Sequence, residues 1–438
     1  MATYKNLRKV LNLPTLSASP SSGVNGEMYF NTGDSALYIY EGEWKKSTQS
    51  AIPLPDWTAS TQQAKVQASD KAASDRFGDD VAIDGNTMAI GAFGIGEGAG
   101  AVYVFTRSGT TWSQQAKIQS SDIAAGDLFG LSVGVAGDTI VVGAYGEGTG
   151  GANAGSAYVF TRSGTTWSQQ AKIQSSDVAA TDRFGSSVSI SSDTVVVGAY
   201  GEDTGGSDAG AAYVFTRSGT TWSQQAKIQA SDKASGDEFA ISVAIDGDTV
   251  VVGAQGEDTG ASSAGAAYVF TRSGTSWSQQ AKIQSSDPQE WDNFGNFVAI
   301  SSDTVVVAAY GEDTGASGAG AAYVFTRSGT SWSQQAKIQA SDAQASDLFG
   351  YSAAITGDTV VVAARDEDAG GSNAGAAYVF TRSGTSWTQA KKLVASDAQA
   401  SDRFGYSVSI SGETVVVGAR QEDTGVTDAG AAYTFIAG

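Results

Sequence analysis

The stretch "SSDVAATDRFG" at residues 175–185 is one of seven near-copies in a chain of 438 residues. Two aromatic markers follow the same repeat. The phenylalanine recurs at Phe77, Phe129, Phe184, Phe239, Phe294, Phe349 and Phe404, and a tryptophan recurs at Trp57, Trp112, Trp167, Trp222, Trp277, Trp332 and Trp387. A fixed period of this kind predicts a repeat architecture, in which each unit buries its apolar face against its neighbours.

Each unit contains four stretches that are typical of short β-strands. In the third unit, "FGSSVSI" (184–190) and "WSQQAKIQ" (222–229) alternate in polarity, whereas "DTVVVGAY" (193–200) and "AAYVFTR" (211–217) are rich in β-branched and aromatic residues. Glycine-rich and aspartate-rich segments separate them. Seven such units predict an all-β fold, a seven-bladed β-propeller of four-stranded antiparallel blades, with an open β-solenoid as the alternative.

The two ends of the repeat region predict that the ring is closed. The chain finishes at "AAYTFIAG" (431–438), after the third strand of the last unit, and "WTASTQQAKVQ" (57–67) precedes the first Phe-Gly pair. The segment 57–67 is therefore expected to be the fourth strand of the last blade, in a propeller domain spanning 57–438. Alternating strand direction places the two long loops of each unit on one face and the tight turns on the other.

Composition narrows the classes of function. The chain has no cysteine and no histidine, which excludes Ser-His-Asp and Cys-His catalysis and favours a non-enzymatic protein. Its 46 acidic and 26 basic side chains give a formal charge of −20, which argues against nucleic acid as a partner. No apolar run approaches the roughly 18–20 residues that cross a bilayer, and the first residues lack a signal-peptide core. We therefore expect that the protein is synthesised in the cytoplasm and does not insert into a membrane.

The repeat unit resembles the FG-GAP repeat of integrin-α-like propellers. The matching residues in the third unit are Phe184, Gly185, Val188, Ile190 and the segment 195–200. The resemblance covers residues 57–438. It implies adhesion or ligand binding on the long-loop face, often with calcium in aspartate-rich loops.

The chain departs from this family at the calcium loops, because the pattern D-x-[DN]-x-[DN]-G is absent. Calcium needs six to eight oxygen ligands, several of them carboxylates. The candidate metal ligands are Glu202, Asp203, Asp208, Glu422, Asp423 and Asp428. The alternative is that these residues, and the aspartate two positions before each repeated phenylalanine, order their own loops through backbone N–H groups.

Residues 1–56 do not belong to the repeat. Residues 1–22 are interpreted as an anchoring segment and residues 23–56 as a small β-hairpin module with a linker. The hairpin, "EMYFNT" (27–32) and "ALYIYEG" (36–42), resembles a module of bacteriophage tail and fibre proteins. The matching residues are Gly26, Met28, Tyr29, Phe30, Asn31, Thr32, Leu37, Tyr38, Ile39, Tyr40 and Trp44. The alternative is a plain hairpin packed on the propeller.

These observations predict a virion protein: a phage fibre, tail or capsid-decorating component that displays an adhesive propeller. Residues 1–56 would contact other virion proteins, the protein would be a homo-oligomer in the particle, and the ring would attach to a host-surface glycan or protein. The alternative is a bacterial cell-surface or secreted adhesin with the same propeller. No cofactor is expected apart from a possible calcium ion.

Departures from the repeat mark the candidate binding residues. The fifth unit alone carries Glu290, Trp291 and Phe297, and an aromatic side chain on a loop can stack on a sugar or anchor a protein contact. The alternative is that Trp291 packs between adjacent loops. Arg365 and Arg420 end the second strands of the last two units and make one side of an acidic face basic, as a site for an acidic glycan or a neighbouring subunit.

Overall fold

The computed structural model describes residues 15–16, 28–31, 36–40, 44–46 and 55–438. The chain divides into two compact units, residues 1–56 and residues 57–438.

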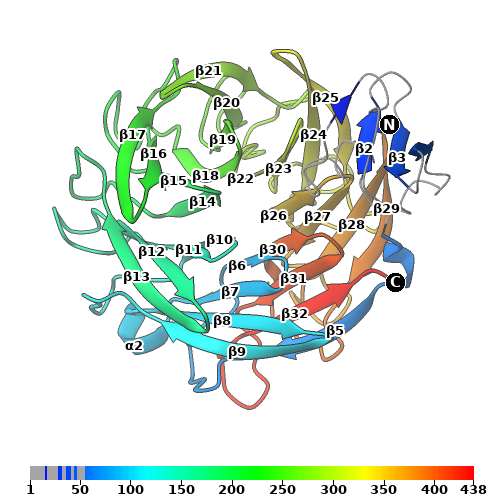
Figure 1. Cartoon of the computed structure of the whole chain (residues 1–438), viewed down its shortest axis with the longest axis horizontal. Helices are drawn as coiled ribbons and strands as arrows, with labels where there is room; N and C mark the ends of the chain where they lie inside the picture. The colour runs from blue at the N-terminus through cyan, green and yellow to red at the C-terminus, as the bar shows by residue number, and fades with distance from the viewer. Residues whose placement is uncertain (1–14, 17–27, 32–35, 41–43, 47–54) are drawn as a thin grey trace. The chain divides into compact units, whose positions relative to one another are not determined.

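Residues 57–438 form seven four-stranded antiparallel sheets arranged as blades around a central channel (Figure 1). We number the blades from the first complete sheet, so that blade 1 is β6–β9 and blade 7 is β30–β32 with β5. This arrangement confirms the predicted all-β seven-bladed propeller.

In blades 1–6 the four strands run in sequence order from the channel outward, and in blade 7 the outermost strand is β5. The first strands are β6 (Val81–Asp84), β10 (Ser132–Ala136), β14 (Ser187–Ser191), β18 (Phe239–Asp246), β22 (Phe297–Ser301), β26 (Phe349–Thr356) and β30 (Phe404–Ser411). The second strands are β7 (Thr87–Ala92), β11 (Thr139–Ala144), β15 (Thr194–Ala199), β19 (Thr249–Ala254), β23 (Thr304–Ala309), β27 (Thr359–Ala364) and β31 (Thr414–Ala419). The third strands are β8 (Ala101–Ser108), β12 (Ser156–Ser163), β16 (Ala211–Ser218), β20 (Ala266–Ser273), β24 (Ala321–Ser328), β28 (Ala376–Ser383) and β32 (Ala431–Ile436). The fourth strands are β9 (Thr111–Ile118), β13 (Thr166–Ile173), β17 (Thr221–Ile228), β21 (Ser276–Ile283), β25 (Ser331–Ile338), β29 (Ser386–Leu393) and β5 (Thr61–Val66).

The hydrophobic core lies between blades. The cluster at the joint of blades 2 and 3, for example, joins Val141 and Val159 to Phe184 and Tyr213. The Phe184 ring is fully buried and lies 5.6 Å from the Tyr213 ring, centroid to centroid. Burying one such side chain contributes about 1.5–3 kcal/mol. Because every blade shares its core with two neighbours, a single unit has no core of its own.

The ring closes as predicted, with β5 from the start of the propeller completing blade 7. Its register with β32 pairs Lys65 with Tyr433 and continues to the bulge between Thr434 and Phe435, at the place where the other blades have their bulge. The predicted start of this strand at residue 57 is wrong, because Trp57 lies in the short 3₁₀ turn η1 (Trp57–Ala59) and the strand begins at Thr61.

Trp57 is therefore not equivalent to the other repeated tryptophans, although it lies at the same spacing in the sequence. In the register of blade 7, Ser60 holds the place that Trp222 has in blade 3. The segment "WTAST" carries three extra residues, and the second-to-third loop of blade 1, which contains the short helical segment α2 (Ile95–Gly98), is three residues shorter than the others. Trp57 is only 1% exposed and packs into the cluster between blades 6 and 7.

The predicted assignment of loops to faces is confirmed. The loop that enters blade 3 bonds to the second-to-third loop of blade 2, since Arg183 N–H donates to Asn153 O at 3.0 Å and Phe184 N–H donates to Ala154 O at 3.0 Å. Equivalent bonds join the other blades around the ring. We call this side of the ring the loop face and the opposite side the tight-turn face.

The described residues of the N-terminal unit form a sheet in the order β1-β2-β3-β4. Its strands are β1 (Thr15–Leu16), β2 (Met28–Asn31), β3 (Ala36–Tyr40) and β4 (Trp44–Lys46). The predicted hairpin is present as the antiparallel pair β2–β3, whereas β1 and β4 were not predicted. The expected anchoring segment 1–22 lies outside the described residues except for β1, so its role stays a prediction. Among the described residues, none of the helices is both long and apolar enough to span a membrane.

Candidate ligand-binding face

The aspartate two positions before each repeated phenylalanine is structural. Asp182 Oδ2 accepts a hydrogen bond from Ala179 N–H at 2.8 Å, three residues back along its own loop. The same bond is made by Asp75, Asp127, Asp237, Asp292, Asp347 and Asp402. Burial raises the pKa of Asp182 to about 6. Since all seven aspartates make the same bond, the loop-ordering interpretation is confirmed.

In blades 2–7 the glutamate of the second-to-third loop faces a lysine. Glu202 is 5% exposed, and its Oε1 accepts from Lys227 Nζ at 2.8 Å and from the Thr204 hydroxyl. Its Oε2 accepts from Gln229 Nε2 at 3.0 Å. Lys227 also pairs with Asp177 at 2.7 Å, so the lysine ties the loop before the blade to the loop within it. In blade 7, Glu422 pairs in the same way with Lys65 at 2.7 Å.

The remaining candidate metal ligands stabilise turns. Asp203 Oδ1 accepts from Asp208 N–H at 2.9 Å, and Asp423 Oδ1 accepts from Asp428 N–H at 2.6 Å. The described residues contain no group of three or more aspartate or glutamate side chains placed to hold a metal ion. Neither the three candidate carboxylates of blade 3 nor the three of blade 7 form such a group, and we assign them to loop geometry and to ion pairs.

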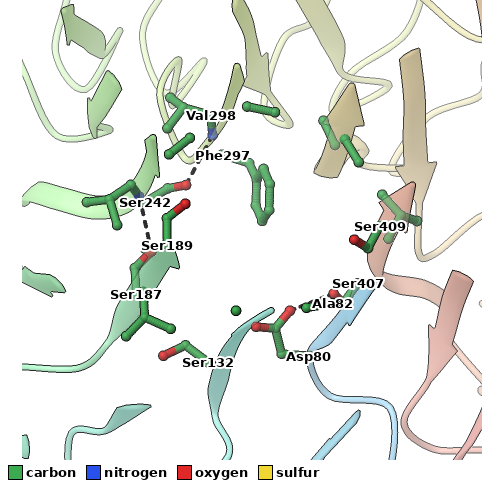
Figure 2. A pocket seen from close by; sticks show the side chains of 18 of the residues that line it. Asp80, Ala82, Ser132, Ser187, Ser189, Ser242, Phe297, Val298, Ser407 and Ser409 are labelled. Carbon is green, nitrogen blue, oxygen red and sulfur yellow. Dashed lines mark hydrogen bonds between the residues drawn. The ribbon is translucent and has the colours of Figure 1, made fainter. Parts of the chain in front are cut away.

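The central channel holds a cavity of about 600 Å³ lined by the first strands of all seven blades (Figure 2). Serine hydroxyls on these strands bridge adjacent blades. Ser187 Oγ accepts from Val243 N–H at 3.0 Å, and Ser242 Oγ accepts from Val298 N–H at 3.1 Å. These bonds occupy the first-strand backbone where it faces the neighbouring blade.

Asp80 takes the serine position in blade 1. Its Oδ2 accepts from Val133 N–H of blade 2 at 2.8 Å, and its Oδ1 accepts from the Ser407 hydroxyl of blade 7 at 2.7 Å. Burial raises the pKa of Asp80 to about 7. Asp80 therefore joins three blades, and its charge state changes near neutral pH.

Phe297 takes the same position in blade 5 and is the bulky exception. Figure 2 shows its ring projecting into the cavity, and the side chain is partly buried against the cluster shared by blades 5 and 6. The sequence grouped Phe297 with Trp291 on one loop. The structure corrects this grouping, because Phe297 begins β22 inside the channel.

Arg365 and Arg420 are neighbours at the loop-face mouth of the channel, and each lies on a tyrosine ring. The Arg365 guanidinium carbon is 3.7 Å from the Tyr351 ring centroid, and that of Arg420 is 3.6 Å from the Tyr406 centroid. The Tyr351 hydroxyl donates to the Tyr406 hydroxyl at 3.0 Å. Arg420 Nη1 also contacts Asp79 Oδ1 at 2.9 Å. The expected basic patch is thus a stacked cluster in which Arg420 is paired with a carboxylate.

The sequence reasoning missed the tyrosines of this mouth, although the repeat contains the signal. The second residue after the repeated phenylalanine takes six different identities in the seven blades. These residues are Asp79, Leu131, Ser186, Ile241, Asn296, Tyr351 and Tyr406, and all of them line the cavity. Because this position varies in an otherwise near-identical repeat, the fold does not require a particular residue there.

Trp291 is exposed on the loop face. Its exposed fraction is 63%, so the alternative that it packs between adjacent loops is wrong. Its φ of +66° lies in the left-handed region, which bulky residues rarely adopt. The other blades place Ser74, Gly126, Thr181, Gly236, Ser346 and Ser401 at this position, all with positive φ. The neighbouring Glu290 is also exposed.

The Trp291 loop is in contact with the segment that carries Tyr310. A Cβ atom on Gly311 would lie 2.0 Å from the Trp291 carbonyl oxygen, so only glycine fits at position 311. The Tyr310 ring is in turn 6.2 Å from the Tyr351 ring, centroid to centroid. Contacts therefore run from the rim of blade 5 at Trp291, through Gly311 and Tyr310, to the channel mouth at Tyr351 of blade 6.

Comparison with known proteins identifies the repeat. The family model of the FG-GAP repeat matches the chain seven times, at residues 60–105, 112–160, 167–215, 222–270, 277–325, 332–380 and 387–435. No curated protein matches the chain.

Proposed function

The chain belongs to the FG-GAP repeat family, whose propellers are generally binding and adhesion domains, and we propose that this propeller attaches a virus particle to a host surface. In this proposal the protein is a non-enzymatic bacteriophage fibre, tail or capsid-decorating component. The loop face meets the host, and residues 1–56 hold the protein on the particle.

The observation that carries the proposal is the exposed Trp291. Among the described residues, the large hydrophobic side chains classed as exposed are Trp291 and Val394. A tryptophan held at positive φ costs free energy that a serine or glycine would reduce or avoid, so the fold does not favour it there. Exposed aromatic side chains contribute strongly to binding when a partner covers them.

The N-terminal unit supports the anchoring role. It forms a sheet of its own, in a unit separate from the propeller. Its β2–β3 hairpin carries eight of the eleven residues that resemble the phage tail and fibre module. The ring closes through β5, so the described residues of the N-terminal unit contribute no strand to any blade. In this proposal that unit is available to bind other virion proteins.

The experiment that tests the proposal is electron microscopy of purified particles. A label on residues 1–56 and a second label on the tight-turn face locate the two units separately. The proposal expects the N-terminal label against a tail or capsid and the ring outside it. Absence of both labels from every particle would refute the virion role, and surface labelling of the producing bacterium would then favour a cellular adhesin.

A further inference from the structure

The tyrosines and arginines at the channel mouth form one group on blades 5–7. We call this group the tyrosine–arginine cluster; it consists of Tyr310, Tyr351, Arg365, Tyr406 and Arg420. Blades 2 and 3 place Leu131 and Ser186 where blades 6 and 7 have Tyr351 and Tyr406, and they still pack with the same strand register. The propeller therefore does not need the cluster to close.

Arg365 presents an unused hydrogen-bonding edge. Stacking on Tyr351 at 3.7 Å holds the guanidinium in place, and its Nε lies 3.5 Å from Asp366 Oδ2. Its terminal nitrogens make no hydrogen bond to the described part of the chain. The guanidinium fork has a planar geometry that matches a carboxylate bidentately.

The arginines at this mouth on blades 6 and 7 each lie near a carboxylate. Arg420 contacts Asp79 at 2.9 Å, and Arg403 Nε lies 3.5 Å from Asp366 Oδ1. The overall charge of −20 does not decide the local interaction, because exposed charges are screened over about 8–10 Å at physiological salt. Within the cluster, Arg420 contacts Asp79 through a terminal nitrogen, whereas Arg365 faces Asp366 through Nε only, so the terminal nitrogens of Arg365 remain available to a ligand.

The cavity beside the cluster has the size and lining of a site for a small polar ligand. Its volume of about 600 Å³ lies within the range of about 300–1,000 Å³ that is typical of ligand sites. Tyr310, Tyr351, Asn296 and Gln255 line it, and the buried Oδ1 of Asn296 has no hydrogen-bond partner. Hydroxyl and amide groups beside aromatic rings suit a ligand that is polar at its edge and apolar on one face.

We propose that the tyrosine–arginine cluster binds a sugar ring that carries a carboxylate, with Arg365 forming two hydrogen bonds to that carboxylate. Tyr310 and Tyr351 contact the apolar face of the ring, and Asn296 accepts from a sugar hydroxyl. The inference rests on the proposed attachment function, to which it adds the chemical class of the ligand.

The test uses the intact protein and free sugars: sodium glucuronate, N-acetylneuraminate and neutral glucose. Saturation-transfer NMR and calorimetry measure binding to the wild type and to two variants. Arg365→Tyr introduces the residue that blades 2, 3 and 5 have at this position, as Tyr145, Tyr200 and Tyr310. Arg183→Ala removes an equal charge from the same face at blade 3, where Arg183 stacks on Tyr200 at 4.8 Å. Equal urea midpoints of the three proteins control for folding.

We expect at least one acidic sugar to bind, at least tenfold weaker binding to Arg365→Tyr, and unchanged binding to Arg183→Ala. The two acids distinguish a uronic acid from a sialic-acid-type source. Glucose binding as tightly as the acids, or undiminished binding to Arg365→Tyr, overturns the inference. If no acidic sugar binds while the protein still attaches to host cells, this inference fails and the proposed function stands; if attachment also fails, both are wrong.

Discussion

Replacing Trp291 with serine should separate binding from folding. Ser346 and Ser401 occupy this position in blades 6 and 7 with φ of +67° and +71°, so serine fits the backbone at +66°. Trp291 leaves 63% of its surface exposed, and the unfolded chain also buries part of such a side chain. The expected change in the free energy of unfolding is therefore within about 1 kcal/mol.

The buried aromatic residues provide the scale for this comparison. Phe184 is fully buried against Tyr213 and Phe215, and Phe184→Ala should cost about 3–5 kcal/mol. Urea unfolding followed by tryptophan fluorescence and circular dichroism measures both variants. Attachment to host cells is measured on the same preparations. A loss of more than about 2 kcal/mol for Trp291→Ser, or undiminished attachment, would refute the reasoning that the fold does not need this residue and that binding does.

Three further predictions concern the stability of the ring. Trp57→Ala should lower the free energy of unfolding by about 3–5 kcal/mol, because Trp57 is 1% exposed at the closing joint; unchanged calorimetric midpoints would contradict this. Lys227→Met should cost about 3–5 kcal/mol by leaving the buried Glu202 without its cation, as urea midpoints can check. Burial raises the pKa of Asp79 to about 6 and of Asp80 to about 7, so their contribution to stability is fully present below pH 3.8 and is lost as pH rises through 6–7. The thermal midpoint should therefore fall between about pH 4 and pH 7, and Asp80→Asn should flatten that dependence.

The period of the sequence predicts the fold because each unit repeats the same strands and the same buried residues. Seven copies of Phe184 and its surroundings leave few ways to bury the apolar surface other than a ring. The start of β5 could not be predicted, since three extra residues after Trp57 compensate for three missing ones in blade 1 and keep the spacing intact.

The candidate site was predictable in position but not in arrangement. Arg365 and Trp291 stand out as departures from the repeat, so the sequence alone points to them. Stacking of Arg365 on Tyr351 joins side chains from neighbouring strands, and the φ of Trp291 depends on bonds between two blades. The first contact forms when two strands of blade 6 pair, and the second forms when blades 4 and 5 pack together, so the pattern of a single strand or loop does not encode them.

The most direct test of the account is binding of the intact protein to isolated host-surface polysaccharides, with variants on both faces of the ring. Trp291→Ser alters the loop face, and Thr220→Ala alters an exposed residue of the tight-turn face. The account predicts that the wild type and Thr220→Ala bind equally and that Trp291→Ser binds at least tenfold more weakly. Equal binding by all three proteins, or a loss confined to Thr220→Ala, would contradict the claim that the loop face is the attachment surface.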